Sequence, residues 1–352
     1  MAKNDNLKDF LTDIADAIRE KEGSTGLINP QEFSAKIRAI ETGGGETPTP
    51  DMPVIGDGKT YLYIRIADKG RMDVPLYFQQ SVANGVTIDW GDGSATQTLS
   101  GTGNVKLSHT YAGVGEYTIS LNPSSGCRLG LGDRSSSCVM GGTGNNKLVY
   151  CNMLQAVEIG KSVTSIDLDA FEDCHSLASV VIPNSVTAIY EYAFQNCYSL
   201  ASVVIPNSVT TISMYAFQDC YSLASVVIPN SVTTISSSAF KNCYSLASVV
   251  IPNSVTSISS NAFSYCYSLA SVVIPNSVTS IGNSAFSYCY GVAFYDFSQC
   301  TSIPTLVGTG VFSNIPSDCK IVVPDALYDT WKAADNWSTY ASKIVKASEF
   351  NG

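Results

Sequence analysis

The feature that most constrains this chain is a segment that occurs five times without a change. The segment is SLASVVIPNSVT, and its copies begin at Ser176, Ser199, Ser222, Ser245 and Ser268. The starts are 23 residues apart, so the sequence is a tandem array and has to be interpreted as one. A unit of this size has no partner for its apolar positions except the next copy. The copies are therefore expected to stack as a solenoid, in which each apolar position becomes a buried ladder.

Within each copy the local pattern predicts two short strands. The β-branched run at 179–182 ends at Pro183, and proline is tolerated at a strand end but not inside a paired strand. A second strand, at 186–189, follows the polar Asn-Ser turn. The positions expected to be buried in the first copy are Leu177, Val180, Ile182, Val186, Ile189, Ala193, Phe194 and Cys197.

The unit also carries a family resemblance. Its form I-P-x-S-V-T-x-I-x-x-x-A-F-x-x-C resembles the BspA-like leucine-rich repeat, which is known from bacterial surface proteins and from phage-encoded proteins. A weaker copy precedes the array from Val157 and a degenerate unit follows at 292–300, which gives about seven turns. The resemblance implies a leucine-rich-repeat solenoid over 157–303. Its register is unbroken over Cys174, Cys197, Cys220, Cys243, Cys266 and Cys289.

Composition limits the partners of the chain. Charged residues make up 14% of the 352 residues, the formal net charge is -10, and lysine and arginine form no cluster. Because binding to phosphates needs such a cluster, we expect no nucleic-acid partner. The apolar runs are too short to span a bilayer, so no membrane insertion is expected. The N-terminal MAKNDNLKDF lacks the apolar region of a signal peptide, so export by that route is not expected.

The cysteines follow the repeat. Six of the 11 occupy one position of the unit, where equivalent side chains in a solenoid form a ladder of small buried hydrophobes. We therefore expect reduced, buried thiols and assembly in a reducing cytoplasm without structural disulfides. No C-x-x-C pair occurs and the two histidines are His109 and His175, so neither a metal site nor a cofactor is expected.

Residues 1–42 are charged and have the apolar periodicity of helices. The segment LTDIADAIREKEGSTGLINPQEFSAKIRAIE resembles the short N-terminal module of phage tail and fibre-like structural proteins. The resemblance implies attachment to the particle, with residues 43–56 as a linker. Because so few apolar residues cannot form an independent core, the apolar stripe is expected to dock on other virion proteins or on a second copy. The stripe consists of Leu7, Phe10, Leu11, Ile14, Ile18, Phe33, Ile37 and Ile40.

Residues 57–122 alternate between apolar and polar side chains, as strands do. The segment I-D-W-G-D-G-S, followed by S-H-T-Y-A-G-V-G-E-Y-T-I-S-L, resembles a PKD-type β-sandwich. Asp89 and Asp92 are weak candidates for a Ca²⁺ site, because Asp-Gly serves the turn and a lone D-x-x-D lacks enough ligands. His109 is expected to make a structural hydrogen bond. Residues 123–156 are predicted to be an irregular transition with one strand candidate at 147–150.

Residues 304–352 are expected to cap the open end of the solenoid. The segment P-D-A-L-Y-D-T-W-K resembles the closing segment that follows BspA-like repeats. The aromatic cluster of Trp331, Trp337 and Tyr340 is most simply the core of that cap. A carbohydrate platform built from the two tryptophans is the alternative, and it stays open at this point.

No catalytic arrangement emerges from the sequence. Between Leu177 and Gly291 the charged residues are Glu191, Asp219 and Lys241, too few for the facing carboxylates of a glycosidase. With no nucleophile and base in a recognisable pattern, we expect the protein not to be an enzyme. The expected fold class is mainly β and multidomain, with a small helical module, a PKD/Ig-like β-sandwich, a leucine-rich-repeat solenoid and a C-terminal cap.

The leading functional hypothesis is a phage virion structural protein of tail-fibre, head-fibre or decoration type. It would be assembled in the host cytoplasm as a homo-oligomer and displayed on the particle exterior. The N-terminal sequence and the lack of a signal peptide favour this hypothesis over the alternative, a bacterial BspA-like cell-surface adhesin. A purely structural decoration protein without a receptor is the third hypothesis.

The binding surface is expected where the copies differ from one another, in two windows that flank the buried Ala-Phe pair. Their Tyr, Ser and Asn content is typical of adaptable recognition surfaces, and the expected partner is a host cell-surface glycan or protein. Unconstrained loops are the alternative, weighed evenly. The candidate binding residues are Tyr190, Glu191, Tyr192, Gln195, Met214, Tyr215, Gln218, Asp219, Lys241, Tyr265 and Tyr288, together with Trp331 and Trp337 of the cap.

Overall fold

The computed structural model describes residues 57–132, 138–141 and 147–350. The strands and helices described below lie in one compact unit, Val54–Glu349. The predicted helical module at 1–42, its attachment residues from Leu7 to Ile40, and the linker at 43–56 all lie outside the described residues. Among the described residues, no helix is both long enough and apolar enough to cross a membrane.

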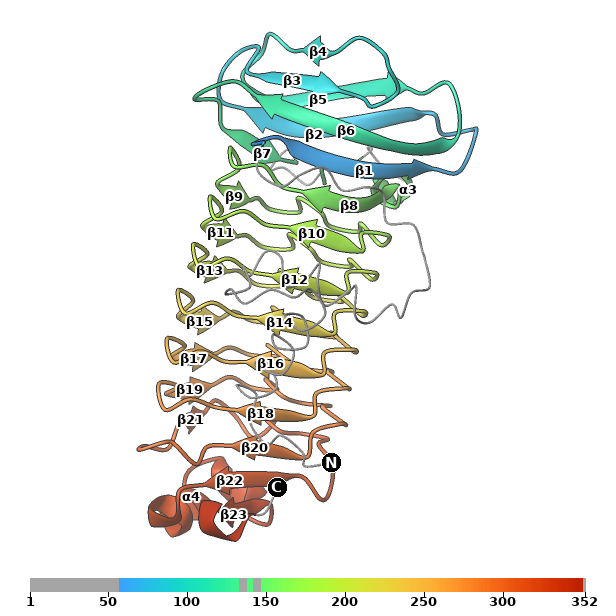
Figure 1. The fold of residues 1–352 in the computed structure, drawn as a ribbon. Helices are drawn as coiled ribbons and strands as arrows, with labels where there is room; N and C mark the ends of the chain where they lie inside the picture. Colours follow the sequence, from blue (N-terminus) through green and yellow to red (C-terminus); the bar gives the residue numbers. More distant parts are fainter. Residues whose placement is uncertain (1–56, 133–137, 142–146, 351–352) are drawn as a thin grey trace, which may run out of the picture. The chain divides into compact units, whose positions relative to one another are not determined.

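The first part of the described chain is a sandwich of antiparallel strands in two layers (Figure 1). Its core contains Leu62, Phe78 and Trp90, which are fully buried. One layer is made of β1 (Thr60–Ile66), β6 (Gly115–Pro123), β3 (Val86–Asp89) and β4 (Gln97–Thr98). The other layer is made of β5 (Gly103–Thr110), β2 (Asp73–Gln80) and β7 (Leu129–Leu131).

The segment after the sandwich differs from the predicted irregular transition. Strand β7 pairs with β2, so the sandwich continues past residue 122. The strand predicted at 147–150 is wrong, because Lys147–Cys151 forms helix α3. The next strand, β8 (Leu154–Glu158), begins only after that helix. The helix directs Cys151 into the core, where it forms a disulfide with Cys138.

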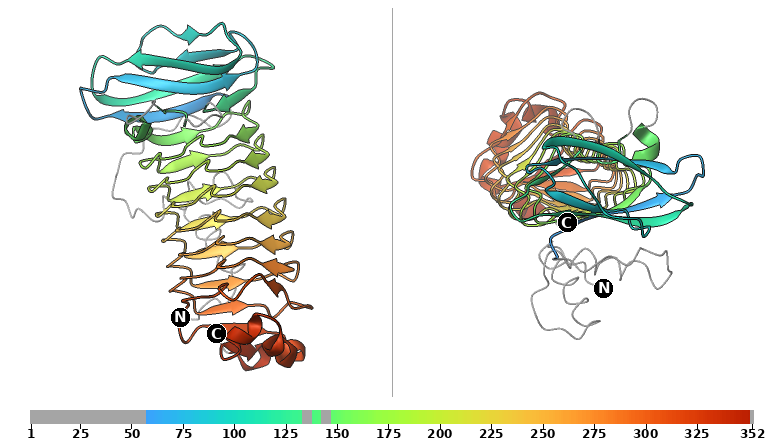
Figure 2. Two further views of the ribbon diagram at one scale, coloured as in Figure 1. Left: turned by 180° about the vertical axis from the view of Figure 1, so that it is seen from behind. Right: turned by 90° about the horizontal axis from the view of Figure 1, so that it is seen from above.

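The solenoid consists of parallel coils, each with a three-residue first strand and a two-residue second strand in most copies (Figures 1 and 2). The first strands are β8, β10 (Ser179–Val181), β12 (Ser202–Val204), β14 (Ser225–Val227), β16 (Ser248–Val250), β18 (Ser271–Val273), β20 (Phe294–Asp296) and β22 (Lys320–Val323). The second strands are β9 (Ser165–Ile166), β11 (Ala188–Ile189), β13 (Thr211–Ile212), β15 (Thr234–Ile235), β17 (Ser257–Ile258), β19 (Ser280–Ile281) and β21 (Thr305–Leu306). Eight first strands make the stack one coil longer than the seven turns expected.

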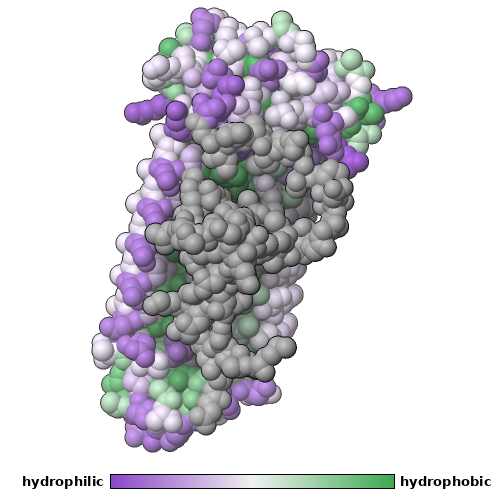
Figure 3. Space-filling view, viewed as in Figure 1, coloured by the Kyte–Doolittle hydropathy of each residue, from purple (hydrophilic) through white to green (hydrophobic). Residues whose placement is uncertain are grey.

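The register of the coils follows the 23-residue repeat. Ser202 pairs with Ser225, and the next residues pair Val with Val. Each strand therefore repeats the side chains of its neighbour, and hydrophilic residues recur at regular intervals along one edge of the array (Figure 3). The predicted solenoid and its buried positions are confirmed, since the apolar residues of the unit are buried in every full copy.

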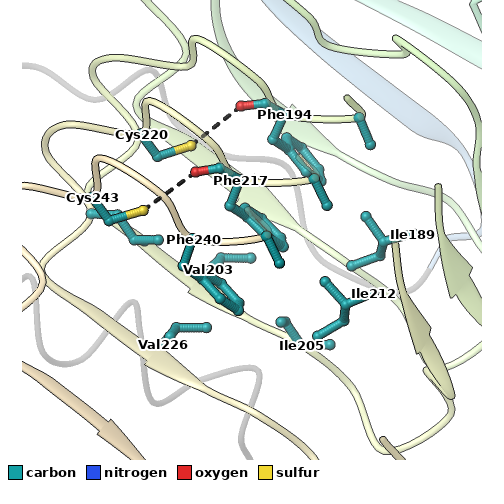
Figure 4. Close-up of a cluster of buried hydrophobic side chains, with 14 of the residues drawn as sticks. Ile189, Phe194, Val203, Ile205, Ile212, Phe217, Cys220, Val226, Phe240 and Cys243 are labelled. Carbon is teal, nitrogen blue, oxygen red and sulfur yellow. Dashed lines mark hydrogen bonds between the residues drawn. The ribbon is translucent and has the colours of Figure 1, made fainter. Parts of the chain in front are cut away.

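The interior of the solenoid contains a ladder of phenylalanines and a ladder of cysteines, next to buried Ile and Val side chains (Figure 4). The phenylalanines stack on one another, with 5.1 Å between the ring centroids of Phe194 and Phe217 and an interplanar angle of 7°. Beside them, the thiol of Cys220 donates a hydrogen bond to the carbonyl oxygen of Phe194 in the preceding coil. Cysteine is therefore both a small buried filler and a partner for a carbonyl that lies away from water.

The sandwich and the solenoid share one sheet. Strand β1 pairs antiparallel with β8, placing Leu62 opposite Val157, so a nine-stranded sheet runs from β4 through β1 to β16. An unpaired first strand would leave a row of free backbone donors and acceptors. Strand β1 covers that edge and acts as the N-terminal cap of the coils.

The other end of the solenoid is closed by the C-terminal residues. Strand β23 (Ile344–Lys346) adds to β22 in parallel. The short helices η2 (Asp325–Leu327), α4 (Tyr328–Ala333) and η3 (Trp337–Tyr340) lie between these two strands in the sequence. Trp331 and Trp337 pack against each other with 5.3 Å between ring centroids. The capping unit expected from the sequence therefore has an aromatic core.

Candidate recognition surface

The predicted binding windows form the turns that follow each second strand. Two residues in each turn have left-handed backbone, for example Tyr192 with φ 58° and Asn196 with φ 60°. Their amides donate to carbonyl oxygens of the following coil, Tyr192 to Met214 at 3.3 Å and Asn196 to Gln218 at 2.9 Å. The stacking of the coils thus fixes the conformation of the turn, and the side chain at each position is left free to vary.

Four of the left-handed positions carry tyrosine: Tyr192, Tyr215, Tyr265 and Tyr288. They form two stacked pairs in adjacent coils. The ring centroids of Tyr192 and Tyr215 lie 5.0 Å apart, and those of Tyr265 and Tyr288 lie 4.4 Å apart. The remaining left-handed positions of these turns carry small or polar residues: Asp169, Asp173, Asn196, Asp219, Ser238, Asn242, Asn261 and Ser284.

The remaining window residues differ in exposure. Tyr190 and Met214 are exposed, with relative accessibilities of 41% and 44%. Partly exposed are Glu191, Gln195, Gln218, Asp219 and Lys241. The candidate window residues are thus all at least partly accessible. None of them is part of the apolar core.

Polar side chains in the second window bond along the stack. Asn196 Nδ2 donates to Asp173 Oδ1 at 2.7 Å, and Asn242 Nδ2 donates to Asp219 Oδ1 at 2.6 Å. Gln218 Nε2 donates to the other oxygen of Asp219 at 2.8 Å. Amide and carboxylate therefore alternate along four coils, so that the acidic oxygens have donors.

One column of aromatic side chains was missed by the sequence reasoning. The residue after each repeat cysteine stacks on its equivalent in the next coil, and the separation of ring centroids is 4.7 Å between Tyr221 and Tyr244. The Tyr that follows the cysteine in most copies was the available signal, because the buried periodicity does not account for it. The column consists of His175, Tyr198, Tyr221, Tyr244, Tyr267 and Tyr290. Burial lowers the pKa of His175, and the nearby Asp173 carboxylate opposes that shift.

The tryptophan platform expected as an alternative site is wrong. Trp331 is 0% and Trp337 is 1% exposed, so neither ring offers a face to a ligand. The Trp337 indole N–H donates to the carbonyl oxygen of Pro304 at 2.8 Å. Both rings are part of the aromatic core of the cap, because closing an open solenoid end requires large buried area.

In the sandwich, Asp89, Asp92 and His109 serve local structure. Asp89 Oδ1 accepts from the backbone N–H of Gly91 at 2.9 Å, as an Asx turn requires. Asp92 Oδ2 lies 2.7 Å from His109 Nε2, the structural hydrogen bond expected for that histidine. Hydrogen bonds from Ser94, and then from His109, lower the pKa of Asp92. The His109 ring also stacks on Trp90 with 4.8 Å between centroids.

The six repeat cysteines are buried and not disulfide-bonded, as expected. Burial raises the pKa of Cys289 to about 12, and it raises those of Cys197, Cys220, Cys243 and Cys266 as well. The disulfide between Cys138 and Cys151 contradicts the expectation of a chain without structural disulfides. The sulfurs of Cys138, Cys151 and Cys174 all lie within 4.8 Å of one another. Two of them are bonded to each other and cannot act as thiolate ligands in this state.

Comparison with known proteins identifies the repeats. The family model described as a BspA type leucine rich repeat region matches residues 143–270 and 187–316, in six copies. Among curated proteins, none matches the chain.

Several solved structures are similar to about half of this chain. A leucine-rich repeat protein from Bacteroides ovatus is 24% identical, with 51% of this chain and 58% of that chain covered and a TM-score of 0.39. A leucine rich cell surface protein from Faecalibacterium prausnitzii is 27% identical, with 49% and 60% covered and a TM-score of 0.33. The leucine-rich repeat protein of T. pallidum is 27% identical, with 55% and 91% covered and a TM-score of 0.32. This chain spans about three fifths of the first two.

Proposed function

Because residues 143–316 of this chain are a BspA-type leucine-rich repeat region, we propose that the protein is a surface-displayed adhesin-like protein that binds a cell-surface molecule through the turns of its solenoid. Binding without catalysis is the proposed activity. Display on a surface is what the resemblance of the repeats implies. The single observation that most supports a role in recognition is the presence of tyrosine at left-handed backbone positions.

The energetics of these tyrosines favour recognition over stability. A bulky residue at positive φ is an outlier, and the left-handed conformation costs roughly 1–2 kcal/mol per residue. A stacked aromatic pair contributes about 0.5–1.5 kcal/mol. The pair Tyr192 and Tyr215 would therefore cost about 2–4 kcal/mol in backbone energy and recover only about 0.5–1.5 kcal/mol of it in stacking.

Other coils show that the turn itself does not need tyrosine. Asn242 and Asn261 occupy equivalent left-handed positions, and Asn is one of the residue types that adopts this conformation most readily. Strained residues that the surroundings hold in place are concentrated at functional sites. Tyrosine is also the residue that gives recognition surfaces a large contact area with few rotatable bonds. The exposed Tyr190 and Met214 extend the same surface.

The test is attachment of the intact, fluorescently labelled protein to a panel of bacterial cells. Changing Tyr190, Tyr192 and Tyr215 together to Ser is expected to weaken attachment at least tenfold, which corresponds to about 1.4 kcal/mol. The matched control changes Asn184 and Asn207 to Ser, because both are exposed in the same coils as these tyrosines but outside the windows. Unchanged attachment by the tyrosine variant would move the site elsewhere. Lack of attachment to every cell type would refute the proposed function.

A second candidate function is a phage virion protein, favoured by the wording of residues 1–42, which resembles the N-terminal module of phage tail and fibre-like proteins. In that case the apolar stripe of the module binds other virion proteins, the chain assembles as a homo-oligomer in the host cytoplasm, and the solenoid is displayed on the particle. The PKD-type resemblance of the sandwich fits a spacer in either candidate. Deleting residues 1–42 should abolish incorporation into particles, and normal incorporation would exclude this role for the module.

A further inference from the structure

Two columns of side chains run side by side along the solenoid. The first lies outside the predicted windows, and the second is part of the second window. The first is the aromatic column after each repeat cysteine, from His175 to Tyr290. The second lies one residue before each cysteine and holds Asp173, Asn196, Asp219, Asn242, Tyr265 and Tyr288. We name the two columns together the tyrosine strip.

Stacking determines which part of each ring is accessible. Within the first column the centroid separations lie between 4.1 Å and 5.3 Å, and the rings are within 22° of parallel. Each interior ring is therefore covered on both faces by its neighbours, and the edge that bears the hydroxyl is what it can present to solvent. Exposure increases toward the end of the array, to 37% for Tyr267 and 55% for Tyr290.

The residue type in the second column changes in the last two coils of the array. In its first four coils the side chains are hydrogen-bonded amides and carboxylates. In the last two coils they are Tyr265 and Tyr288, which contact the first column edge to face at 6.1 Å and 6.0 Å between centroids. Four tyrosines thus form one cluster, composed of Tyr265, Tyr267, Tyr288 and Tyr290.

The presence of tyrosine in the strip, and not phenylalanine, indicates which kind of ligand the strip can bind. Phenylalanine stacks equally well at the buried ladder, with 5.5 Å between the centroids of Phe240 and Phe263. The strip instead uses tyrosine, whose hydroxyl can donate and accept hydrogen bonds while its ring contacts apolar groups. A ligand suited to the strip carries both hydroxyl groups and C–H surface.

The charge of the array and its periodicity restrict the chemical class of the ligand further. From Leu177 to Gly291 the charged residues are Glu191, Asp219 and Lys241, so the strip cannot neutralise a polyanion. The same side chains recur once per coil, which suits a ligand that also repeats along its length. A folded protein has no such period, whereas a linear glycan has one.

We propose that the tyrosine strip binds a neutral, linear polysaccharide that lies along the stack of coils and contacts the four-tyrosine cluster. The proposal rests on the proposed function, since it names the chemical class of the bound surface molecule. The hydroxyls of the strip and the amides of Asn196 and Asn242 bond to sugar hydroxyls. The ring edges contact the C–H groups of successive sugar units.

The test is affinity electrophoresis of the intact protein through gels that contain hydroxyethylcellulose, laminarin, soluble starch or mannan, with dextran sulfate as the charged counterpart. At least one neutral polymer is expected to retard the protein. Changing Tyr267 and Tyr290 to Ser should raise the apparent Kd at least tenfold. Changing both to Phe keeps the stacking and should raise it by a smaller factor, because only the hydroxyl contacts are lost. The matched control changes Val227 and Val273, which are exposed on the same array, to Ser and should bind as the unmodified protein does.

The outcomes separate this inference from the function on which it rests. Retardation by dextran sulfate alone, by no neutral polymer, or to an equal extent in the Tyr267 and Tyr290 variant would overturn the polysaccharide site, even if the protein attaches to cells. Retardation by a neutral polymer that depends on these tyrosines supports the site, even if no cell type binds. Circular dichroism melting of each variant shows whether a loss of binding reflects unfolding.

Discussion

The thiol of Cys220 donates a hydrogen bond of 3.2 Å to the carbonyl oxygen of Phe194, which lies 26 residues earlier in the chain. The same bond joins Cys197 to Phe171 and Cys243 to Phe217. In each case the repeat cysteine is a second donor to a buried carbonyl of the preceding coil, which also accepts from the backbone N–H of the cysteine in its own coil. The cysteine ladder is therefore part of the cohesion between coils.

Changing Cys220 to Ala should lower the free energy of unfolding by about 0.5–1.5 kcal/mol, because the carbonyl of Phe194 loses the thiol donor and keeps only the backbone N–H of Cys197. The measurement is the urea midpoint, compared at equal slope. Changing the exposed Ser222 to Ala in the same turn is the control, with an expected effect within about 0.5 kcal/mol. Equal midpoints for the two variants would contradict a role for the thiol in stability.

The repeat thiols should not react while the protein is folded. Alkylation requires the thiolate, and burial raises the pKa of Cys289 to about 12 and that of Cys266 as well. At pH 8, iodoacetamide followed by mass spectrometry should find these residues modified only after unfolding in urea. Modification of the native protein at Cys266, or a disulfide at that position, would contradict a buried ladder of free thiols.

Stability should decrease between about pH 4.5 and pH 7 because of Glu158. Burial, and then the charge of Asp57, raises the pKa of Glu158 from 4.5 to about 7. In that window the folded state holds more protons than the unfolded state. The contribution is therefore complete below the unfolded pKa and is lost as the pH rises through the folded pKa. Melting temperatures measured from pH 4.5 to pH 7.5 would show the decrease.

The variant Glu158→Gln should remove this pH dependence, since the amide does not titrate. The exposed Glu116, changed to Gln, is the matched control and should retain it. A pH profile that is the same in the unmodified protein and in the Glu158 variant would assign the dependence to other groups.

Replacing the tyrosines at left-handed positions should affect binding without lowering the stability of the fold. Changing Tyr192 and Tyr215 to Asn removes roughly 1–2 kcal/mol of backbone strain per residue and loses a stack of about 0.5–1.5 kcal/mol. The urea midpoint is therefore expected to stay the same or rise, while cell attachment falls. A clear loss of stability in this variant would show that the tyrosines serve the fold.

Changing Trp337 to Ala should cost about 3–5 kcal/mol, because the indole is buried against Phe297, Phe312 and Trp331. Contacts in a solenoid are between neighbouring coils, so the loss should be local. Hydrogen exchange should show lost protection in β20, β22 and β23, with the sandwich strands unaffected. Full protection throughout would mean that the cap does not depend on this ring.

The repeats could be predicted because an exact period defines its own contacts. Leu177, Phe194 and Cys197 are buried where the pattern predicted them, since each has the equivalent residue of the next copy as its partner. The sandwich was recognisable from its alternation and turn signals. Its PKD-type resemblance and the phage-like module at 1–42 stay predictions.

Other features depend on contacts that no local pattern contains. The pairing of Leu62 with Val157 joins segments far apart in the sequence, and only the folded register decides it. Residues 147–150 were compatible with strand or helix, because a short apolar run does not distinguish the two. Trp331 and Trp337 suit a buried core and a sugar platform equally well in sequence, and only their burial decides. The aromatic column from His175 to Tyr290 escaped notice because a period of one ring per coil gives no amphipathic signal within a coil.

Strand β1 closes one end of the solenoid and the tryptophan cap closes the other, whereas five of the coils between them share a constant 12-residue core. Any interior coil meets its neighbours through the same Phe stack, thiol bond and Ser-Val register. A chain that lost the 23 residues from Ser199 to Tyr221, or gained a copy of them, would present unchanged surfaces to both ends. The interior coils are therefore interchangeable. The length of the solenoid and the number of its binding sites can change by whole repeats in descendants of this protein without a change of fold.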